Sequence, residues 1–322
     1  LKVAVCTNSA CTTANTYTLD SAGVLGLYTS IAIGLDGNPI ISYWDATNGD
    51  LKVAVCTNSA CTTANTYTLD SAGDVGGYTS ITIGTNGNPI ISYYDYTNTN
   101  LKVVACTNPT CNPTTSAAGI YTLDSTGNVG SFTSIAIGIN GYPIISYLDQ
   151  SSYNLKVAAC TDITCSAADT YTLDSNGDVG LYTSISIGTN GNPIISHNDN
   201  TNGDLKVAAC TNPTCNPSVS ATSSYTIDNS TGYVGEYTSL AIGISGNPII
   251  SYYDSTNGNL KIAACTNPTC TAANTYTLDS TGDVGWDTSI AIGANGVPII
   301  SYLDATNFDL KVAFAWWPAG GR

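Results

Sequence analysis

The chain is poor in positive charge and in long apolar stretches, and each shortage excludes a class of function. Only 8 of its 322 residues are Lys or Arg, against 23 Asp or Glu, so the formal net charge is −15. Binding to nucleic acid needs a basic surface that displaces counterions, so neither nucleic acid nor a bare anionic membrane is an expected partner. No apolar run approaches the ~20 residues of a membrane-spanning helix.

Groups that carry catalysis are also scarce. The chain has one His, His197, and one Glu, Glu236, and it shows no nucleophile–base pair, phosphate loop or paired Glu. Its near-identical repeats present the same groups again and again, whereas catalysis normally needs unlike groups at one site. The sequence therefore predicts a protein that is not an enzyme and requires no cofactor.

What the chain has in quantity is typical of β-structure. Hydrophobic residues reach 43% while charged residues make up 10%, the reverse of a disordered chain. Tyr is abundant (21 residues), Thr and Val recur, and Met is absent, which favours pleated, half-buried surfaces. The first residue is Leu1 rather than Met, so we expect a leader segment to precede it.

A repeat of about 50 residues runs through the whole chain. In the second unit it contains four short β-rich segments separated by turns, one of them an Asn-Gly turn typical of hairpins. These segments are residues 78–84, 89–95, 101–107 and 120–124. Tight hairpins make antiparallel neighbours, which disfavours a parallel β-helix. The pattern predicts an all-β protein, a six-bladed β-propeller with four antiparallel strands per ~50-residue blade.

The predicted blades form a single domain over residues 1–322. They lie at about residues 28–70, 78–124, 132–174, 182–228, 237–279 and 287–317, the last closed by residues 1–20.

Each repeat contains one Cys-x4-Cys pair, and no Cys is left over. Zinc needs about four converging ligands, which separate blades do not bring together, so we predict one disulfide within each blade. The predicted bridges are Cys6–Cys11, Cys56–Cys61, Cys106–Cys111, Cys160–Cys165, Cys210–Cys215 and Cys265–Cys270. Six bridges indicate an oxidising, extracellular setting, either secreted or at the cell surface.

When four antiparallel strands follow one another in a blade, most Asp residues fall in the turns at one end of the blades. One Lys per unit lies at the same end, and we expect it to pair with an Asp of its own blade. The crossovers between blades read Asp-Ser-x-Gly-Asp/Asn-Val-Gly, and their oxygens are candidate Ca²⁺ ligands. The alternative is that these Asp residues set turn geometry. The candidate calcium residues are Asp70, Asp74, Asp174, Asp178, Asp279 and Asp283.

A second candidate site lies where the second strand of each blade ends in Tyr-x-Asp. An aromatic plane beside carboxylates can bind a sugar, and the alternative is packing between blades. The candidate ligand-binding residues are Tyr43, Tyr93, Tyr147, His197, Tyr252, Tyr302, Asp45, Asp95, Asp149, Asp199, Asp254 and Asp304.

The runs Gly37–Ala54 and Gly246–Ala263, with the Leu-Lys-Val segment and Cys pair, resemble repeats of secreted, largely uncharacterised bacterial proteins. The resemblance covers essentially the whole chain and implies an extracellular β-propeller, with no activity attached. Six-bladed fungal and bacterial lectins are similar in architecture only, because their Arg, Glu and Trp sugar-site pattern is missing here.

One strand is in surplus. The Leu-Lys-Val/Ile segment occurs seven times, whereas the other segments occur six times. If residues 1–20 complete the last blade, the segment from Leu310 to Trp317 is displaced. An unpaired apolar strand is a template for pairing with another chain. We therefore predict self-association through Phe314, Trp316 and Trp317, with a local edge strand as the alternative.

From these features we expect an extracellular, non-catalytic structural or adhesive propeller that can assemble into a filament or layer. The alternative is a lectin-like or calcium-dependent recognition module at the acidic, Tyr-lined end. The expected partners are further copies of the chain and, for the alternative, glycans.

Overall fold

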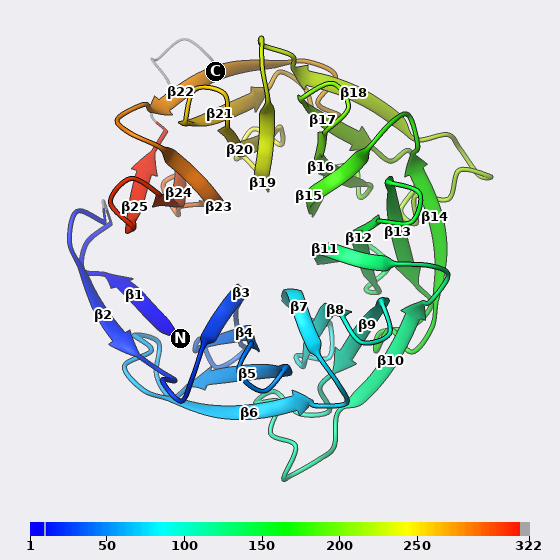
Figure 1. Ribbon diagram of the computed structural model, residues 1–322. Helices are drawn as coiled ribbons and strands as arrows, with labels where there is room; N and C mark the ends of the chain where they lie inside the picture. The colour runs from blue at the N-terminus through cyan, green and yellow to red at the C-terminus, as the bar shows by residue number, and fades with distance from the viewer. Residues whose placement is uncertain (10, 316–322) are drawn as a thin grey trace. The chain divides into compact units, whose positions relative to one another are not determined.

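The computed structural model describes residues 1–9 and 11–315, which form 25 β-strands (Figure 1). The predicted fold class is confirmed: the chain is an all-β, six-bladed propeller built from four-stranded antiparallel blades. Within the described residues there is no helix that is long and apolar enough to cross a membrane.

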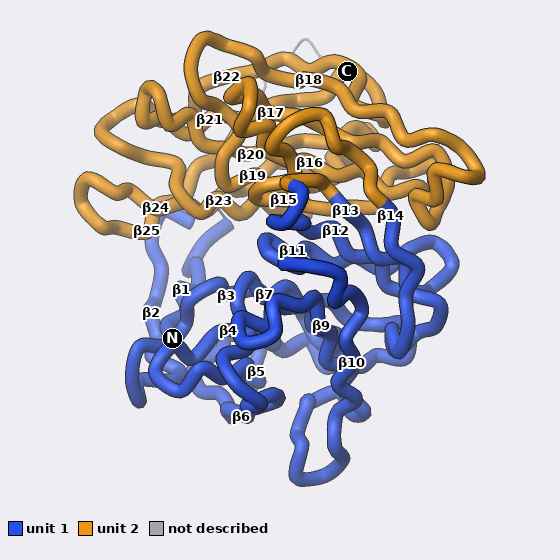
Figure 2. Tube along the Cα trace, turned by 45° about the vertical axis from the view of Figure 1, so that its right-hand side comes forward, with its two compact units in different colours: residues 1–152, 156–171 blue, residues 153–155, 172–322 orange. Residues whose placement is uncertain are grey.

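The chain divides into two compact units, residues 1–152 with 156–171 and residues 153–155 with 172–322 (Figure 2). Unit 1 holds β1 (Lys2–Cys6), β2 (Ala14–Thr18), β3 (Leu25–Ile33), β4 (Pro39–Asp45), β5 (Asp50–Cys56), β6 (Ala64–Asp70), β7 (Val75–Ile83), β8 (Pro89–Asp95), β9 (Asn100–Ala105), β10 (Gly119–Asp124), β11 (Val129–Ile137) and β12 (Pro143–Asp149). The boundary falls within β13 (Asn154–Cys160) and β14 (Ala168–Asp174). Unit 2 holds β15 (Val179–Ile187), β16 (Pro193–Asp199), β17 (Asp204–Ala209), β18 (Ser223–Asp228), β19 (Val234–Ile242), β20 (Pro248–Asp254), β21 (Asn259–Cys265), β22 (Ala273–Asp279), β23 (Val284–Ile292), β24 (Pro298–Asp304) and β25 (Asp309–Phe314).

Each complete blade is a meander whose turns follow from its sequence. Between β7 and β8, Gly87 has a φ of +80°, which suits glycine, and the Asn88 amide donates to Asn86 Oδ1 at 3.0 Å. Pro89 then opens β8, at the strand position where a missing donor is tolerated. The first strands of successive blades lie next to one another within each unit, β3 beside β7 and β7 beside β11.

The core consists of apolar layers between neighbouring blades. In unit 1, Val53 of the first blade and Ile91 and Val104 of the second are fully buried in one cluster. Both faces of a blade are buried in this way, which explains why the second and third strands read as nearly continuous apolar runs.

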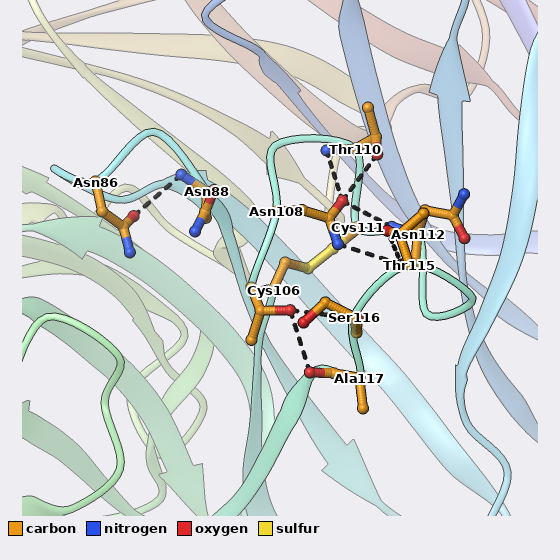
Figure 3. The surroundings of a disulfide bond; sticks show 11 residues. Asn86, Asn88, Cys106, Asn108, Thr110, Cys111, Asn112, Thr115, Ser116 and Ala117 are labelled. Atoms are coloured by element: carbon orange, nitrogen blue, oxygen red, sulfur yellow. Dashed lines mark hydrogen bonds between the residues drawn. A yellow bond between two sulfur atoms is a disulfide. The ribbon is translucent and has the colours of Figure 1, made fainter.

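All six predicted disulfides are confirmed, each within one repeat and with Cα atoms 4.8–5.0 Å apart. Each bridge closes the turn between the third and fourth strands. Figure 3 shows Cys106–Cys111, where Asn108 Oδ1 accepts hydrogen bonds from the backbone amides of Thr110 and Asn112 at 3.2 and 3.1 Å. The bridge and the asparagine together fix the turn from which the long loop of this blade departs.

The surplus strand is accommodated differently from the prediction. β25 pairs with β24 and takes the third position of the last blade, whose sheet has three strands in the described structure. The segment that begins at Leu310 is therefore not displaced. β1 and β2 pair with each other as a separate two-stranded sheet, so the expected strand pairing of residues 1–20 with the last blade is not seen there. Phe314 is half-buried, and Trp316 and Trp317 lie outside the described residues.

Candidate functional site

The tyrosines predicted to line a ligand site are buried between blades. Tyr93 is fully buried, and its hydroxyl donates to Asp70 Oδ2 at 2.6 Å. Lys102 Nζ donates to the same oxygen at 2.6 Å and lies 5.5 Å from the centroid of the Tyr93 ring. We call this Asp–Tyr–Lys group the interblade latch. The latches are Asp20–Tyr43–Lys52, Asp70–Tyr93–Lys102, Asp124–Tyr147–Lys156, Asp228–Tyr252–Lys261 and Asp279–Tyr302–Lys311, with Asp174–Lys206 as an incomplete sixth.

The latch corrects the predicted partner of each lysine. Asp70 ends β6 of the first blade, whereas Lys102 lies on β9 of the second, so the short ion pair joins two blades. The aspartate of the lysine's own blade, Asp95, is farther away at 3.8 Å. The tyrosines therefore lie where the alternative interpretation of interblade packing placed them.

The electrostatics of the latch favour the ionised carboxylate. Burial raises the pKa of Asp70, but hydrogen bonds from Lys102, Tyr93 and the Ala72 amide outweigh it, and the net pKa is lowered. Burial and the neighbouring carboxylate raise the pKa of Tyr93, so its hydroxyl remains a donor. The shared oxygen thus accepts two charge-assisted hydrogen bonds, which are the strong kind.

His197 occupies the tyrosine position of the sixth latch and is fully buried. Its Nδ1 accepts from the Gly180 amide at 3.3 Å, and its Nε2 lies 3.9 Å from Asp174 Oδ2 without a hydrogen-bond partner among the described residues. Ser224 donates to Asp174 instead, at 2.7 Å. Burial lowers the pKa of His197 to about 4, with Asp174 opposing the effect.

The aspartates that end the second strands cap the following turns. Asp45 Oδ1 accepts from the Thr47 and Asn48 amides, both at 3.1 Å, and Asp45 Oδ2 accepts from the Asn48 side chain at 2.9 Å. Equivalent bonds are made by Asp95, Asp149, Asp199, Asp254 and Asp304. These carboxylates act in turn geometry, as in other Asx turns.

Most of the candidate calcium carboxylates accept hydrogen bonds from protein groups. Asp70, Asp174 and Asp279 belong to latches, and Asp283 Oδ1 accepts from Tyr253 and Trp286 at 2.5 and 3.0 Å. Asp178 Oδ2 accepts from Asn200 at 2.7 Å, whereas Asp178 Oδ1 is buried without a hydrogen-bond partner among the described residues. At Asp74 it is the backbone amide that donates to Thr97. No group of three His, Cys, Asp or Glu suited to a metal occurs in the described part of the chain. Calcium binding stays a prediction.

A different set of aromatic residues is brought together at the start of each first strand. The β7–β8 register shifts twice, between Val75 and Gly77 and between Gly77 and Ser80, so β7 carries two extra residues, and Tyr78 takes a φ of +51°. Gly76 lets β7 approach the preceding blade, because a Cβ there would lie 2.8 Å from Leu51 Cα. A bulge of this kind turns a side chain out of the strand's alternation. The same left-handed conformation occurs at Tyr28, Tyr78, Phe132, Tyr182, Tyr237 and Asp287.

In unit 1 these bulges build a row of aromatic rings. The ring centroids of Tyr28 and Tyr78 are 4.4 Å apart, and those of Tyr78 and Phe132 are 4.5 Å apart. Trp44 lies 5.9 Å from Tyr28, whose side chain is 40% exposed. We call Tyr28, Trp44, Tyr78 and Phe132 the unit 1 aromatic row.

In unit 2 the bulges build a cluster that also contains carboxylates. The Tyr182 and Tyr237 centroids are 4.6 Å apart, and Trp286 stacks on Tyr237 at 5.6 Å. Glu236 and Asp287 stand at bulge positions beside these rings. Burial and the charge of Asp287 raise the pKa of Tyr237 to about 12. We call Tyr182, Tyr237, Trp286, Glu236 and Asp287 the unit 2 aromatic–acid cluster.

The sequence contained the signal for both groups. Val-Gly-x-Tyr/Phe-Thr-Ser opens the first strand in most repeats, but strict alternation does not show that a bulge turns the aromatic residue outward. The predicted ring took the tyrosine of the second strand instead, one residue before Trp44. That tyrosine faces the neighbouring blade because its hydroxyl belongs to a latch.

Solved structures of the same fold are distant in sequence. A hydrazine synthase chain from Kuenenia stuttgartiensis is similar over 88% of this chain and 82% of its own, with 12% identity and a TM-score of 0.56. A puromycin hydrolase is similar over 92% of this chain and 48% of its own, with 14% identity and a TM-score of 0.54. An α-L-arabinofuranosidase from Lactobacillus brevis gives a TM-score of 0.45 at 9% identity, with 92% of each chain covered. No protein family model and no curated protein matches the chain.

The likenesses to the hydrazine synthase and the puromycin hydrolase show the fold, and they overturn one prediction. The prediction that the protein is not an enzyme was wrong, because it rested on a ring of repeated blades and structures of this fold include hydrolases. Its second premise, that all blades present the same groups, also fails at Glu236 and Asp287.

Proposed function

We propose that the protein is an extracellular carbohydrate-recognition protein with a sugar-binding surface in each unit: the unit 1 aromatic row and, separately, the unit 2 aromatic–acid cluster. The observation that carries the proposal is the set of bulges, which turn partly exposed rings out of otherwise buried strands. Non-glycine residues in the left-handed region cost free energy, and such strain concentrates at functional sites. Sugar rings have apolar faces that pack on aromatic planes and hydroxyls that pair with carboxylates and amides.

The setting is consistent with this role. All twelve cysteines are bridged, as expected for an oxidising compartment, and the acidic surface does not favour anionic polymers. The earlier prediction of a structural or adhesive role is compatible with glycan recognition, since adhesion to a polysaccharide needs a binding site of this kind.

Affinity electrophoresis and calorimetry with soluble neutral oligosaccharides would test the proposal. We expect Tyr78→Ala and Tyr237→Ala each to weaken binding by about three- to tenfold, the loss of one aromatic contact worth about 1 kcal/mol. Tyr276→Ala, at an exposed tyrosine on β22, is the matched control and should leave binding unchanged. Chromatography of the glycan after incubation shows whether it is also cleaved. Unchanged binding in both ring variants would contradict the proposal.

A further inference from the structure

The unit 2 aromatic–acid cluster departs from the repeat at two positions. The residue before each bulge is Leu27, Gly77, Ser131, Leu181, Glu236 or Trp286, and the bulge residue is Tyr28, Tyr78, Phe132, Tyr182, Tyr237 or Asp287. Four blades thus present a neutral residue followed by an aromatic ring. The fifth blade adds a carboxylate before its ring, and the sixth replaces its ring with one.

Both carboxylates stand next to the same rings. Glu236 directly precedes Tyr237 on β19, and Asp287 directly follows Trp286 on β23, whose ring stacks on Tyr237 at 5.6 Å. Glu236 faces Tyr253 in the β19–β20 register and accepts a 3.4 Å hydrogen bond from Ser255. The charges of both Glu236 and Asp287 act on Tyr182 and Tyr237, and raise the pKa of these two hydroxyls after the larger effect of burial. Two adjacent blades therefore place a carboxylate beside one pair of tyrosine rings, whose planes are tilted by 49° at a centroid distance of 4.6 Å.

Protein cations do not neutralise this charge within the described part of the chain. Six of the seven lysines are held in latches, and the seventh, Lys2, lies on β1 in unit 1. No ion pair reaches Glu236 or Asp287 among the described residues. Burial raises the pKa of Glu236, and the hydrogen bond from Ser255 opposes this effect. The protein around Asp287 displaces part of its hydrating water and raises its pKa, although the side chain still reaches solvent. A bound cation would relieve both.

We infer that the unit 2 aromatic–acid cluster binds a positively charged amino sugar, with the ammonium group against Glu236 and Asp287 and the sugar face on Tyr182 and Tyr237. The inference rests on the proposed function and names its ligand class. A cation over a tyrosine or tryptophan face adds attraction to the carboxylate contacts. The unit 1 aromatic row has no acidic residue at the corresponding positions, so it suits a neutral sugar ring.

The experiment compares two oligosaccharides of equal length and linkage, a glucosamine oligomer that carries amines and the neutral N-acetylglucosamine oligomer. Calorimetry on the full chain at low salt should show about tenfold tighter binding of the glucosamine oligomer. The double variant Glu236→Gln/Asp287→Asn should remove the preference, because it should lower the affinity for the glucosamine oligomer about tenfold more than the affinity for the neutral oligomer. The control Asp36→Asn/Asp169→Asn removes the same net charge at exposed sites and should retain the preference.

The pH profile gives a second readout. Binding of the glucosamine oligomer should rise as the two carboxylates ionise and fall as the ligand's amine loses its proton, whereas binding of the neutral oligomer should vary little. Equal affinity for the two oligomers would overturn this inference and leave the proposed function standing. A preference lost equally in the control variant would also overturn it, because net charge would explain it. If neither oligomer binds and the neutral panel also fails, the proposed function falls with it.

Discussion

At the scale of single residues, one carboxylate oxygen in each latch links two neighbouring blades. Asp70 Oδ2 accepts from a lysine and a tyrosine of the next blade, and Asp70 Oδ1 accepts from the Ala72 amide of its own crossover. The pKa of Asp70 is lowered in the folded state, so its stabilising effect is present above the unfolded pKa near 3.8 and is lost as the pH falls through the folded value.

Removing the Asp70 carboxylate should destabilise the folded state. We expect Asp70→Ala to lower the free energy of unfolding by about 3 kcal/mol, because the buried Lys102 loses its close partner and keeps only Asp95 at 3.8 Å, while the Tyr93 hydroxyl loses its acceptor. Chemical denaturation followed by circular dichroism would measure it. Asp169→Asn, which converts an exposed carboxylate on β14 to the residue found in most other repeats, should stay within about 0.5 kcal/mol. Equal effects of the two variants would contradict the latch.

His197 makes the sixth latch sensitive to acid. Its folded pKa of about 4 lies below the ordinary value of 6.5, so the unfolded chain binds more protons between these values. Stability from the neutral imidazole is therefore complete above about pH 6.5 and is lost as the pH falls toward about 4, by at most roughly 3 kcal/mol.

His197→Tyr should restore the missing hydroxyl bond to Asp174 and raise stability by about 1 kcal/mol at neutral pH. It should also flatten the melting temperature between about pH 6.5 and about pH 4 relative to the parent. Tyr93→His is the converse control and should steepen the same profile. Parallel profiles for parent and variant would show that His197 does not titrate in this range.

At the scale of strands, the bulge at the start of each first strand strains the backbone and turns the side chain of the bulge residue outward. Tyr78 in the left-handed region is held there by the two extra residues of β7 and by the close packing of Gly76 on Leu51. A bulky side chain in this region is strained by about 1–2 kcal/mol.

This strain predicts that glycine at position 78 gives a more stable protein than alanine, the reverse of the usual order in a strand. Both Tyr78→Gly and Tyr78→Ala remove the ring, but only glycine adopts a positive φ without strain, so Tyr78→Gly should be the more stable variant by about 1 kcal/mol. At an ordinary strand position the order is the reverse. The melting temperatures of the two variants, measured by thermal denaturation, test this order. A more stable alanine variant would mean that residue 78 does not keep its φ of +51° in solution.

The strands and disulfides followed from the sequence, whereas the site did not, for a local reason. Pro89, the Asn-Gly turn and the Cys pairs act within a few residues, so their effects can be predicted from spacing. The role of Tyr93 depends on Asp70 in the neighbouring blade, 23 positions away. The orientation of Tyr78 depends on two extra residues of β7 that only the pairing with β8 reveals. The Asp–Lys partner was wrong for the same reason.

At the scale of the whole molecule, the last blade has an open edge. β25 pairs with β24 on one side, and in the described residues no strand pairs with its other side. The Ala315 amide donates to Pro298 on β24, so by alternation the Val312 amide points toward the open side. An open edge with apolar residues can accept a strand from another molecule.

We therefore retain the prediction of self-association and assign it to this edge. Val312→Pro removes an outward donor and should abolish concentration-dependent association measured by sedimentation, while the circular dichroism of the fold persists. Ile244→Pro is the control for an unspecific effect of proline and should associate like the parent, because Ile244 is exposed at the second position of the Gly243–Gly246 turn, where proline is favoured. Association that survives Val312→Pro would place the contact elsewhere.

The latch also makes each blade depend on the segment that precedes it. Lys52 and Tyr43 are bonded to Asp20, which follows β2, just as Lys102 and Tyr93 are bonded to Asp70, which ends β6. The unit that repeats is therefore an aspartate together with the tyrosine and lysine that come after it. Insertion or loss of one whole repeat supplies or removes these three groups together, so the number of blades can change without leaving a buried lysine or carboxylate unpaired.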